Sequence, residues 1–141
     1  MFKKVLVAAD GSPTAKRAVE AAAELAAMSG GTLHIVTALT PKSVGDANLP
    51  GEFKNMGNDG GGGALLQDLS FIARAHGLEP VLHHMGGDPA DAIIETAERI
   101  DADLVVVGNR GMKGARRILG SVPNTVAHGV NCSVMVIDTT E

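Results

Sequence analysis

A chain of 141 residues with a single cysteine and a formal net charge of −4 suits one domain without an internal disulfide, and the acidity argues against general nucleic-acid binding. The chain is 45% hydrophobic but has no Trp or Tyr and only three Phe, so its core must be mainly aliphatic, as in parallel sheets covered by helices. No apolar run approaches the ~18 residues that span a bilayer, and the N-terminus does not resemble a signal peptide. We therefore expect a cytoplasmic protein without membrane contact.

The first 39 residues show a strand, a helix and a second strand. Residues 4–9 (KVLVAA) form an apolar run that predicts a short buried strand. Ser12 and Pro13 then provide a capping hydroxyl and a proline suited to the first turn of a helix. The glycine pair at 30–31 ends that helix, and residues 32–39 (TLHIVTAL) predict the next strand.

Residues 41–63 have a different composition, with two prolines, seven glycines and no clear hydrophobic period. We interpret them as a long flexible loop within a single domain that covers residues 1–141. The glycine run at 60–63 looks like a phosphate loop, but no apolar strand precedes it and no Lys-Ser or Lys-Thr follows it. A flexible connection is the better interpretation.

The second half of the chain repeats the alternation. Asp88 and Pro89 follow a glycine turn and form a second combination of helix cap and first-turn proline, and Asp88 is interpreted as a cap alone. The remaining elements are helices over residues 64–76, 89–100 and 122–128 and strands over residues 80–85, 103–108 and 133–138.

This order, βαβαβαβαβ, predicts an α/β fold: a three-layer αβα sandwich around a five-stranded parallel sheet, Rossmann-like in its winding. In such sheets ligands bind beyond the carboxyl ends of the strands, where the winding direction reverses. If the first strand is central and the fourth is its neighbour, Asp10 and Gly108 lie side by side at that point.

The stretch from Gly108 to Ser121 has the features of an anion site. It carries four basic residues and no acid, net +4, whereas residues 1–107 are net −6. Its glycines let backbone N–H groups approach an anion closely, and Ser121 stands at the start of a helix, where free N–H groups favour phosphate. Asp10 is placed to accept hydrogen bonds from a ribose hydroxyl. A site for phosphates and a sugar suggests a nucleotide.

The sequence resembles the universal stress protein family over nearly its whole length. The resemblance is carried by residues 5–12 (VLVAADGS), by Gly87-Asp88-Pro89, by the glycine-rich stretch from Gly108 to Val122, and by residues 131–137 (NCSVMVI). It implies an adenine nucleotide alpha hydrolase-like fold and a homodimer formed through the last strand. It also implies a stress-response regulator that binds ATP or a related adenine nucleotide, with or without Mg²⁺.

The resemblance also suggests roles for individual residues. Gly108, Gly111, Gly120 and Ser121 match the family's phosphate loop, Gly-x2-Gly-x9-Gly-Ser/Thr, while Asp10 would lie near the ribose and the backbone of Ala38 would meet the adenine. The full set of candidate binding residues is Ala9, Asp10, Ala38, Gly108, Arg110, Gly111, Gly120, Ser121 and Val122.

Two departures from the family pattern leave alternatives open. Only eight residues separate Gly111 from Gly120, one fewer than in the pattern, and the second strand ends Thr37-Ala38-Leu39 where the family more often has His-Val-Val. A nucleotide-free dimeric scaffold is therefore one alternative. Slow ATP hydrolysis or nucleotidyl transfer is another, although the Walker pattern and a candidate water-activating carboxylate are both missing.

Other reactive residue types have simpler interpretations. His83 and His84 are adjacent on a strand and should point to opposite faces, so a zinc site is not expected. Cys132 is expected to be a buried or interfacial thiol. Ser12 and Ser121 have no recognisable His/Asp partners, so serine hydrolase chemistry has no support. The remaining histidines, interpreted as isolated and either structural or exposed, are His34, His76 and His128.

Overall fold

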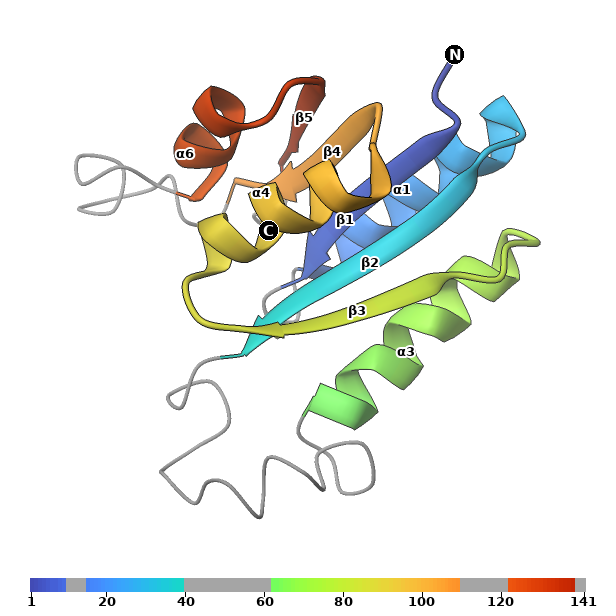
Figure 1. Ribbon diagram of the computed structural model, residues 1–141. Helices are drawn as coiled ribbons and strands as arrows, with labels where there is room; N and C mark the ends of the chain where they lie inside the picture. The colour runs from blue at the N-terminus through green and yellow to red at the C-terminus, as the bar shows by residue number, and fades with distance from the viewer. Residues whose placement is uncertain (10–14, 40–61, 110–121, 139–141) are drawn as a thin grey trace.

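The computed structural model of the protein describes residues 1–9, 15–39, 62–109 and 122–138. Strands and helices alternate through these ranges (Figure 1). In chain order the elements are β1 (Lys4–Ala9), α1 (Ala15–Ser29), β2 (Thr32–Leu39), α3 (Gly62–Ala75), β3 (Val81–Gly86), α4 (Pro89–Ile100), β4 (Leu104–Gly108), α6 (Val122–Gly129) and β5 (Ser133–Ile137).

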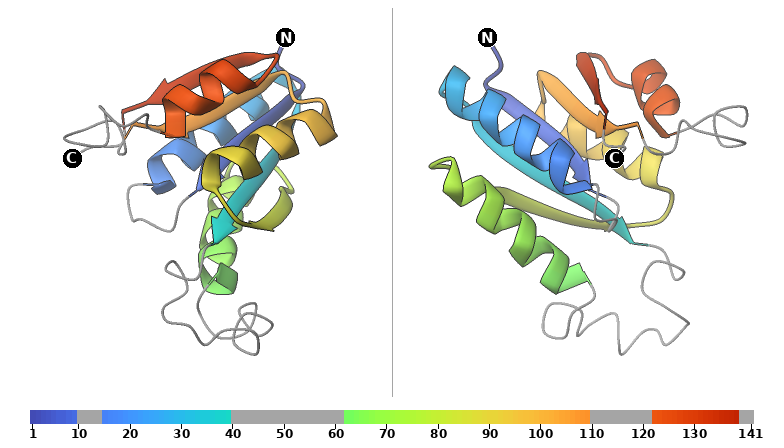
Figure 2. Two further views of the ribbon diagram at one scale, coloured as in Figure 1. Left: turned by 60° about the vertical axis from the view of Figure 1, so that its left-hand side comes forward. Right: turned by 180° about the vertical axis from the view of Figure 1, so that it is seen from behind.

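The five strands form one parallel sheet in the order β3-β2-β1-β4-β5. Helices α4 and α6 cover one face of the sheet, and the view from behind in Figure 2 shows α1 and α3 on the other. The α/β class, the three layers and the five parallel strands are confirmed. The central position of β1, with β4 beside it, is confirmed as well.

The core is aliphatic on both faces of the sheet because successive side chains of a buried strand point in opposite directions. In β1, Val5 and Val7 pack toward α1, whereas Leu6 packs with Ile93 of α4 and Val126 of α6. All three β1 side chains are fully buried. The helix facing β1 is rich in alanine, which lets its backbone approach the sheet closely.

Most predicted boundaries agree with the observed ones to within one or two residues. Helix α3 begins at Gly62, so the last two residues of the predicted 41–63 loop belong to a helix. The rest of that loop, and the predicted cap formed by Ser12 and Pro13, lie outside the described residues. The predicted cap of α4 is confirmed: the Asp88 side chain accepts a hydrogen bond from the Asp91 backbone N–H at 3.1 Å, and Pro89 follows in the first turn.

The amino-terminal edge of the sheet is held by polar contacts. The Asp103 carboxylate accepts hydrogen bonds from the backbone N–H groups of Lys3 and Lys4, at 2.8 and 3.1 Å. The Lys3 ammonium donates to the Ser29 carbonyl at the end of α1, and the Lys4 ammonium donates to the Ile100 carbonyl at the end of α4. Adjacent lysines thus contact the carboxyl ends of helices on opposite faces of the sheet, where the helix dipole favours positive charge.

Within the ranges given above, no helix is long and apolar enough to cross a membrane.

Candidate functional site

The carboxyl ends of β1, β2 and β4 bring three of the predicted site residues to one edge of the sheet. Val7 pairs with Val106 across β1 and β4, and the same offset two residues later sets Ala9 level with Gly108. Ala9 also pairs with Thr37 of β2, so Ala38 lies one residue further along that strand. Figure 1 shows the arrowheads of β1, β2 and β4 on the side of the sheet away from the N-terminus.

This edge is the point where the winding of the sheet reverses. From β1 the chain moves outward through β2 to β3, and then returns to the other side of β1 for β4 and β5. Crevices at such reversals are the usual ligand sites of open parallel sheets. Of the remaining predicted site residues, Val122 is the first residue of α6, while Asp10, Arg110, Gly111, Gly120 and Ser121 lie outside the described part of the chain.

Both ends of the glycine-rich stretch are anchored. Just after Gly108, the Asn109 N–H donates to the Ile137 carbonyl at 2.9 Å, and the Asn109 side-chain amide donates to the Asp138 carboxylate at 3.3 Å. At the other end, Val122 is partly buried against the core cluster beneath α4 and α6. The residues on either side of the stretch therefore contact the rest of the fold. Sequence reasoning missed the contact of Asn109 with Asp138, because it depends on β4 and β5 being neighbours.

Thr37 places a hydroxyl group within the sheet close to this edge. Its side chain is fully buried, and its Oγ1 atom has no hydrogen-bond partner among the described residues. Leu33 and Ile35, at alternate positions before it, pack in the cluster beneath α1, so the hydroxyl faces that layer and not the edge itself. The only sequence signal for it was a threonine among the apolar residues of the second half of the strand.

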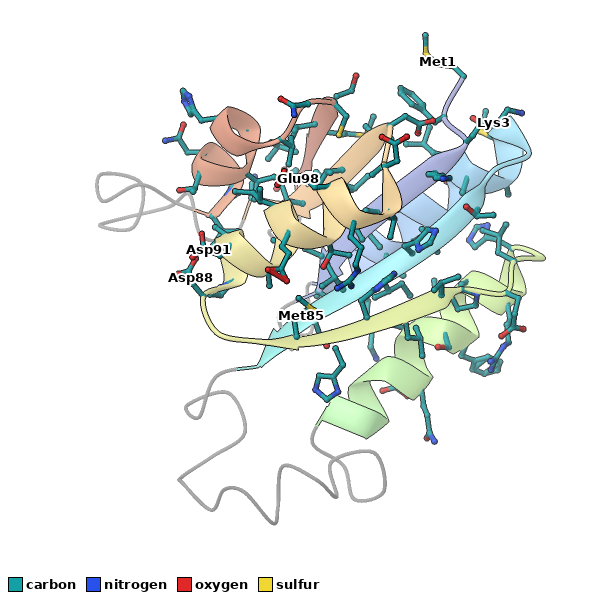
Figure 3. The ribbon with its side chains drawn as sticks, in the orientation of Figure 1. Met1, Lys3, Met85, Asp88, Asp91 and Glu98 are labelled. Carbon is teal, nitrogen blue, oxygen red and sulfur yellow. The ribbon has the colours of Figure 1, made fainter. Side chains whose placement is uncertain are left out.

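Asp88 accepts hydrogen bonds from the first turn of its own helix, α4. Besides its side-chain contact with Asp91, its carbonyl accepts a hydrogen bond from the Ala92 N–H at 3.0 Å. Figure 3 shows Asp88 and Asp91 together at the beginning of α4, beyond the end of β3 where Met85 lies. The preceding Gly87 has φ +96, a conformation that side chains disfavour, which explains the glycine turn before the cap. The interpretation of Asp88 as a helix cap is thus supported by its contacts.

The prediction that His34 is isolated is wrong. Its Nδ1 atom lies 3.0 Å from Nε2 of His83, and the two rings stack with centroids 5.2 Å apart. The two residues are far apart in the sequence but occupy neighbouring strands, so only the pairing of β2 with β3 brings them together. Among the described residues, no group of three His, Cys, Asp or Glu side chains could hold a metal ion.

Cys132 does not have the environment of a nucleophile. Its thiol is partly buried, and burial, followed by the nearby Asp103 carboxylate, raises the pKa of the thiol above its ordinary value. A raised pKa reduces the thiolate fraction at neutral pH, and the thiolate is the reactive form.

The sequence matches the universal stress protein family over residues 1–138. The chain belongs to the universal stress protein family. It is 35% identical over 145 residues to a universal stress protein of Mycobacterium tuberculosis, covering 99% of this chain and 98% of that one. It is 30% identical over 145 residues to universal stress protein A homolog 1 of Coxiella burnetii, covering 96% of each. The resemblance identified from the motifs is confirmed.

Solved structures of universal stress proteins have the same fold. One, in complex with cAMP, is 33% identical to this chain with a TM-score of 0.79, and the match covers 99% of this chain and 98% of the other. The Archaeoglobus fulgidus protein in complex with dAMP is 25% identical with a TM-score of 0.71, and the match covers 97% and 98%. Both of these relatives bind an adenine nucleotide.

Proposed function

We propose that this universal stress protein binds ATP or a related adenine nucleotide at the carboxyl edge of β1, β2 and β4 and acts as a stress-response regulator. The observation that carries the proposal is the parallel pairing of β1 with β4, in register up to Val7 and Val106, at the point where the sheet reverses its winding. The residues that follow Gly108 carry a net charge of +4 through Ser121, which suits a polyanionic ligand. The complexes of two relatives with cAMP and dAMP support the adenine nucleotide.

The proposed roles of the residues follow from their chemistry. Backbone N–H groups of Gly108, Gly111, Gly120 and Ser121, with the basic side chain of Arg110, would bind the phosphates. Ala9 and Val122 would border the ligand from the end of β1 and the start of α6. Asp10 would accept hydrogen bonds from the ribose. The backbone of Ala38 would contact the adenine. With the phosphates bound, Mg²⁺ would neutralise part of their charge.

We also propose that the protein forms a homodimer through β5. Among the described strands, β5 is at the edge of the sheet and next to β4 only, so its outer side is available for pairing with another strand. Val136, near the end of β5, is 44% exposed. A second copy pairing along β5 would cover both the edge and this apolar side chain.

A nucleotide-free scaffold is the second candidate function. The loop from Gly111 to Gly120 is one residue shorter than the family pattern, and that shortening favours this alternative. Since the sequence has no recognisable water-activating carboxylate near the loop, we propose a binding protein and not an enzyme.

Calorimetric titration of the purified protein with ATP, in the presence and absence of Mg²⁺, tests the proposal. We expect one nucleotide to bind per chain. Asp10→Ala should weaken binding by about tenfold to a hundredfold, the effect of losing hydrogen bonds to a charged acceptor. Gly120→Val should weaken it as strongly, because a branched side chain would separate the phosphate from the backbone.

Glu98→Ala is the matched control for the aspartate variant. Glu98 is exposed on α4, and its replacement removes the same charge without touching the proposed site (Figure 3). Equal affinity of the wild type and both site variants would refute the assignment of the residues. A wild-type protein that binds neither ATP, AMP nor cAMP, and is not stabilised by them, would favour the scaffold.

A further inference from the structure

Three side chains from three different elements form a chain of polar contacts under α4. Arg99, near the end of α4, places its Nη2 atom 3.2 Å from Nδ1 of His83 on β3. The other ring nitrogen of His83, Nε2, lies 3.0 Å from Nδ1 of His34 on β2. The contacts therefore connect a helix, the edge strand and its neighbour.

The arginine determines where the protons of this chain lie. A guanidinium can only donate hydrogen bonds, so Nδ1 of His83 must accept one and carries no proton. A neutral His83 then has its proton on Nε2 and donates it to Nδ1 of His34, which must also be unprotonated. Every contact in the chain is satisfied only when both imidazoles are neutral.

Protonation of either ring breaks this arrangement. A proton on Nδ1 of His34 removes the acceptor of the His83 N–H group, and a proton on Nδ1 of His83 removes the acceptor of Arg99. When His34 is protonated, moving the proton of His83 from Nε2 to Nδ1 does not restore the contacts, because the new Nδ1–H group would point at Arg99. A protonated His83 also places a second positive charge beside the guanidinium, and a protonated His34 places one near Lys4.

The surroundings do not offset that charge. The pKa of His34 is lowered by burial, and further by His83 and by Lys4 of β1, while the pKa of His83 is lowered by burial and by Arg99. Helix α4 also carries Asp91, Glu95 and Glu98. Within the described ranges, none of these carboxylates forms an ion pair with Arg99 or with either imidazole. On β3, the neighbouring His84 points to the opposite face of the sheet.

We propose that the contacts Arg99–His83–His34 form an acid-sensitive latch, which holds α4, β3 and β2 together while both imidazoles are neutral and opens when either is protonated. The inference does not depend on nucleotide binding. A metal ion is the less suitable occupant of the pair, because Arg99 and Lys4 would repel a cation.

The element released by the latch is an edge strand of the sheet. In the part of the chain that the structure describes, β3 pairs with β2 alone, and its first two residues, Val81 and Leu82, are 45% and 43% exposed. Strands with few buried contacts are the first to open locally. Opening of the latch would therefore loosen β3 and the carboxyl half of α4 before the rest of the fold.

The direction of the pH dependence follows from the lowered pKa values. Above the ordinary histidine pKa of 6.5, His34 and His83 are neutral in both the folded and the unfolded chain. The free energy of unfolding then has its full value. As the pH falls below the ordinary histidine pKa, the unfolded chain takes up protons that the folded chain resists. Stability therefore decreases toward acid until the folded imidazoles are themselves protonated.

Two measurements on the full-length protein test the latch. NMR titration of the imidazole signals should give midpoints for His34 and His83 below the ordinary histidine value of 6.5. Hydrogen-exchange protection factors, which correct for the intrinsic effect of pH on exchange, should fall by about tenfold in β3 and the end of α4 between about pH 7.5 and about pH 5.5.

Three variants separate the latch from a general effect of acid. His83→Gln should remove most of the loss of protection, because the glutamine does not titrate, whereas His128→Gln should behave as the wild type. Arg99→Gln should raise both midpoints, since a protonated imidazole could then bond to a neutral one.

Midpoints of His34 and His83 at or above the ordinary value of 6.5 would overturn the proposal, even if His83→Gln fails to fold. An unchanged loss of protection in a folded His83→Gln protein would also overturn it.

Discussion

Replacing Gly31 with alanine should destabilise the protein strongly, although the residue lies outside every strand and helix. Gly31 links the end of α1 to β2 and passes over the start of β1. A Cβ atom at this position would lie 2.5 Å from the Phe2 carbonyl oxygen and 2.8 Å from that of Lys3, whereas ordinary contacts begin at 3.4 Å. Both obstacles are backbone atoms, so no rotation of a side chain can relieve the overlap.

The size of the effect can be worked out from these contacts. The start of β1 would have to move by about 0.9 Å to restore ordinary contact with the new methyl group. Overpacking of this kind costs about 1–3 kcal/mol. The Lys3 carbonyl also accepts hydrogen bonds from the Thr32 N–H at 2.8 Å and the Thr32 hydroxyl at 3.2 Å, and weakening of these adds about 1 kcal/mol. We expect Gly31→Ala to lower the free energy of unfolding by about 2–4 kcal/mol.

Gly30 is the matched control because it differs in the source of its strain. It has φ +66 in the turn that ends α1, and a Cβ atom there would meet nothing within 4 Å. Gly30→Ala should therefore cost only the conformational strain, about 1–2 kcal/mol.

Urea unfolding followed by circular dichroism measures both variants, and the thermal midpoint should fall by about 3 °C for each kcal/mol. A Gly31→Ala protein as stable as Gly30→Ala would refute the reasoning, since it would show that the start of β1 can move without a loss of folding free energy.

Two further substitutions test contacts at opposite edges of the sheet. Asp103→Ala should lower the free energy of unfolding by about 1–3 kcal/mol in urea titrations, because the Lys3 and Lys4 N–H groups lose their carboxylate, and Asp103→Asn should recover part of the loss. If Asp103→Ala leaves the free energy of unfolding unchanged within error, water replaces the carboxylate without a loss of stability. Asp88→Ala should cost about 1 kcal/mol by removing the cap of α4 but leave ATP affinity unchanged, since its carboxylate is engaged by Asp91. A large loss of affinity by calorimetry would show that Asp88 contacts the ligand.

The elements of this protein could be predicted because their signals are local. Residues 4–9 and 104–108 are apolar runs too short for a helix, and both are strands. Asp88 and Pro89 start α4 because a side-chain acceptor and a restricted φ act within one helical turn. β3 was placed one residue early, since its side chains are mostly exposed and its sequence shows little hydrophobic contrast at the boundary.

The candidate site could be predicted only in outline. The motifs indicated that Gly108 follows a strand and that a basic, glycine-rich stretch comes next. Its predicted proximity to Asp10 was conditional on the order of the strands, because the same alternation of strands and helices is compatible with several orders. The contact between Asn109 and Asp138 was not predictable, because it joins the ends of two strands that are neighbours only in the folded sheet.

The amino-acid sequence by itself determined the α/β class, the aliphatic core, the family and the location of the glycine-rich stretch, since these depend on composition, periodicity and contiguous motifs. The tertiary structure decided which residues from distant segments meet. It paired His34 with His83 and set Asp103 beneath the start of β1. Such contacts depend on strand order and register. These arise from the packing of the whole sheet and cannot be recognised from the residues nearby in sequence.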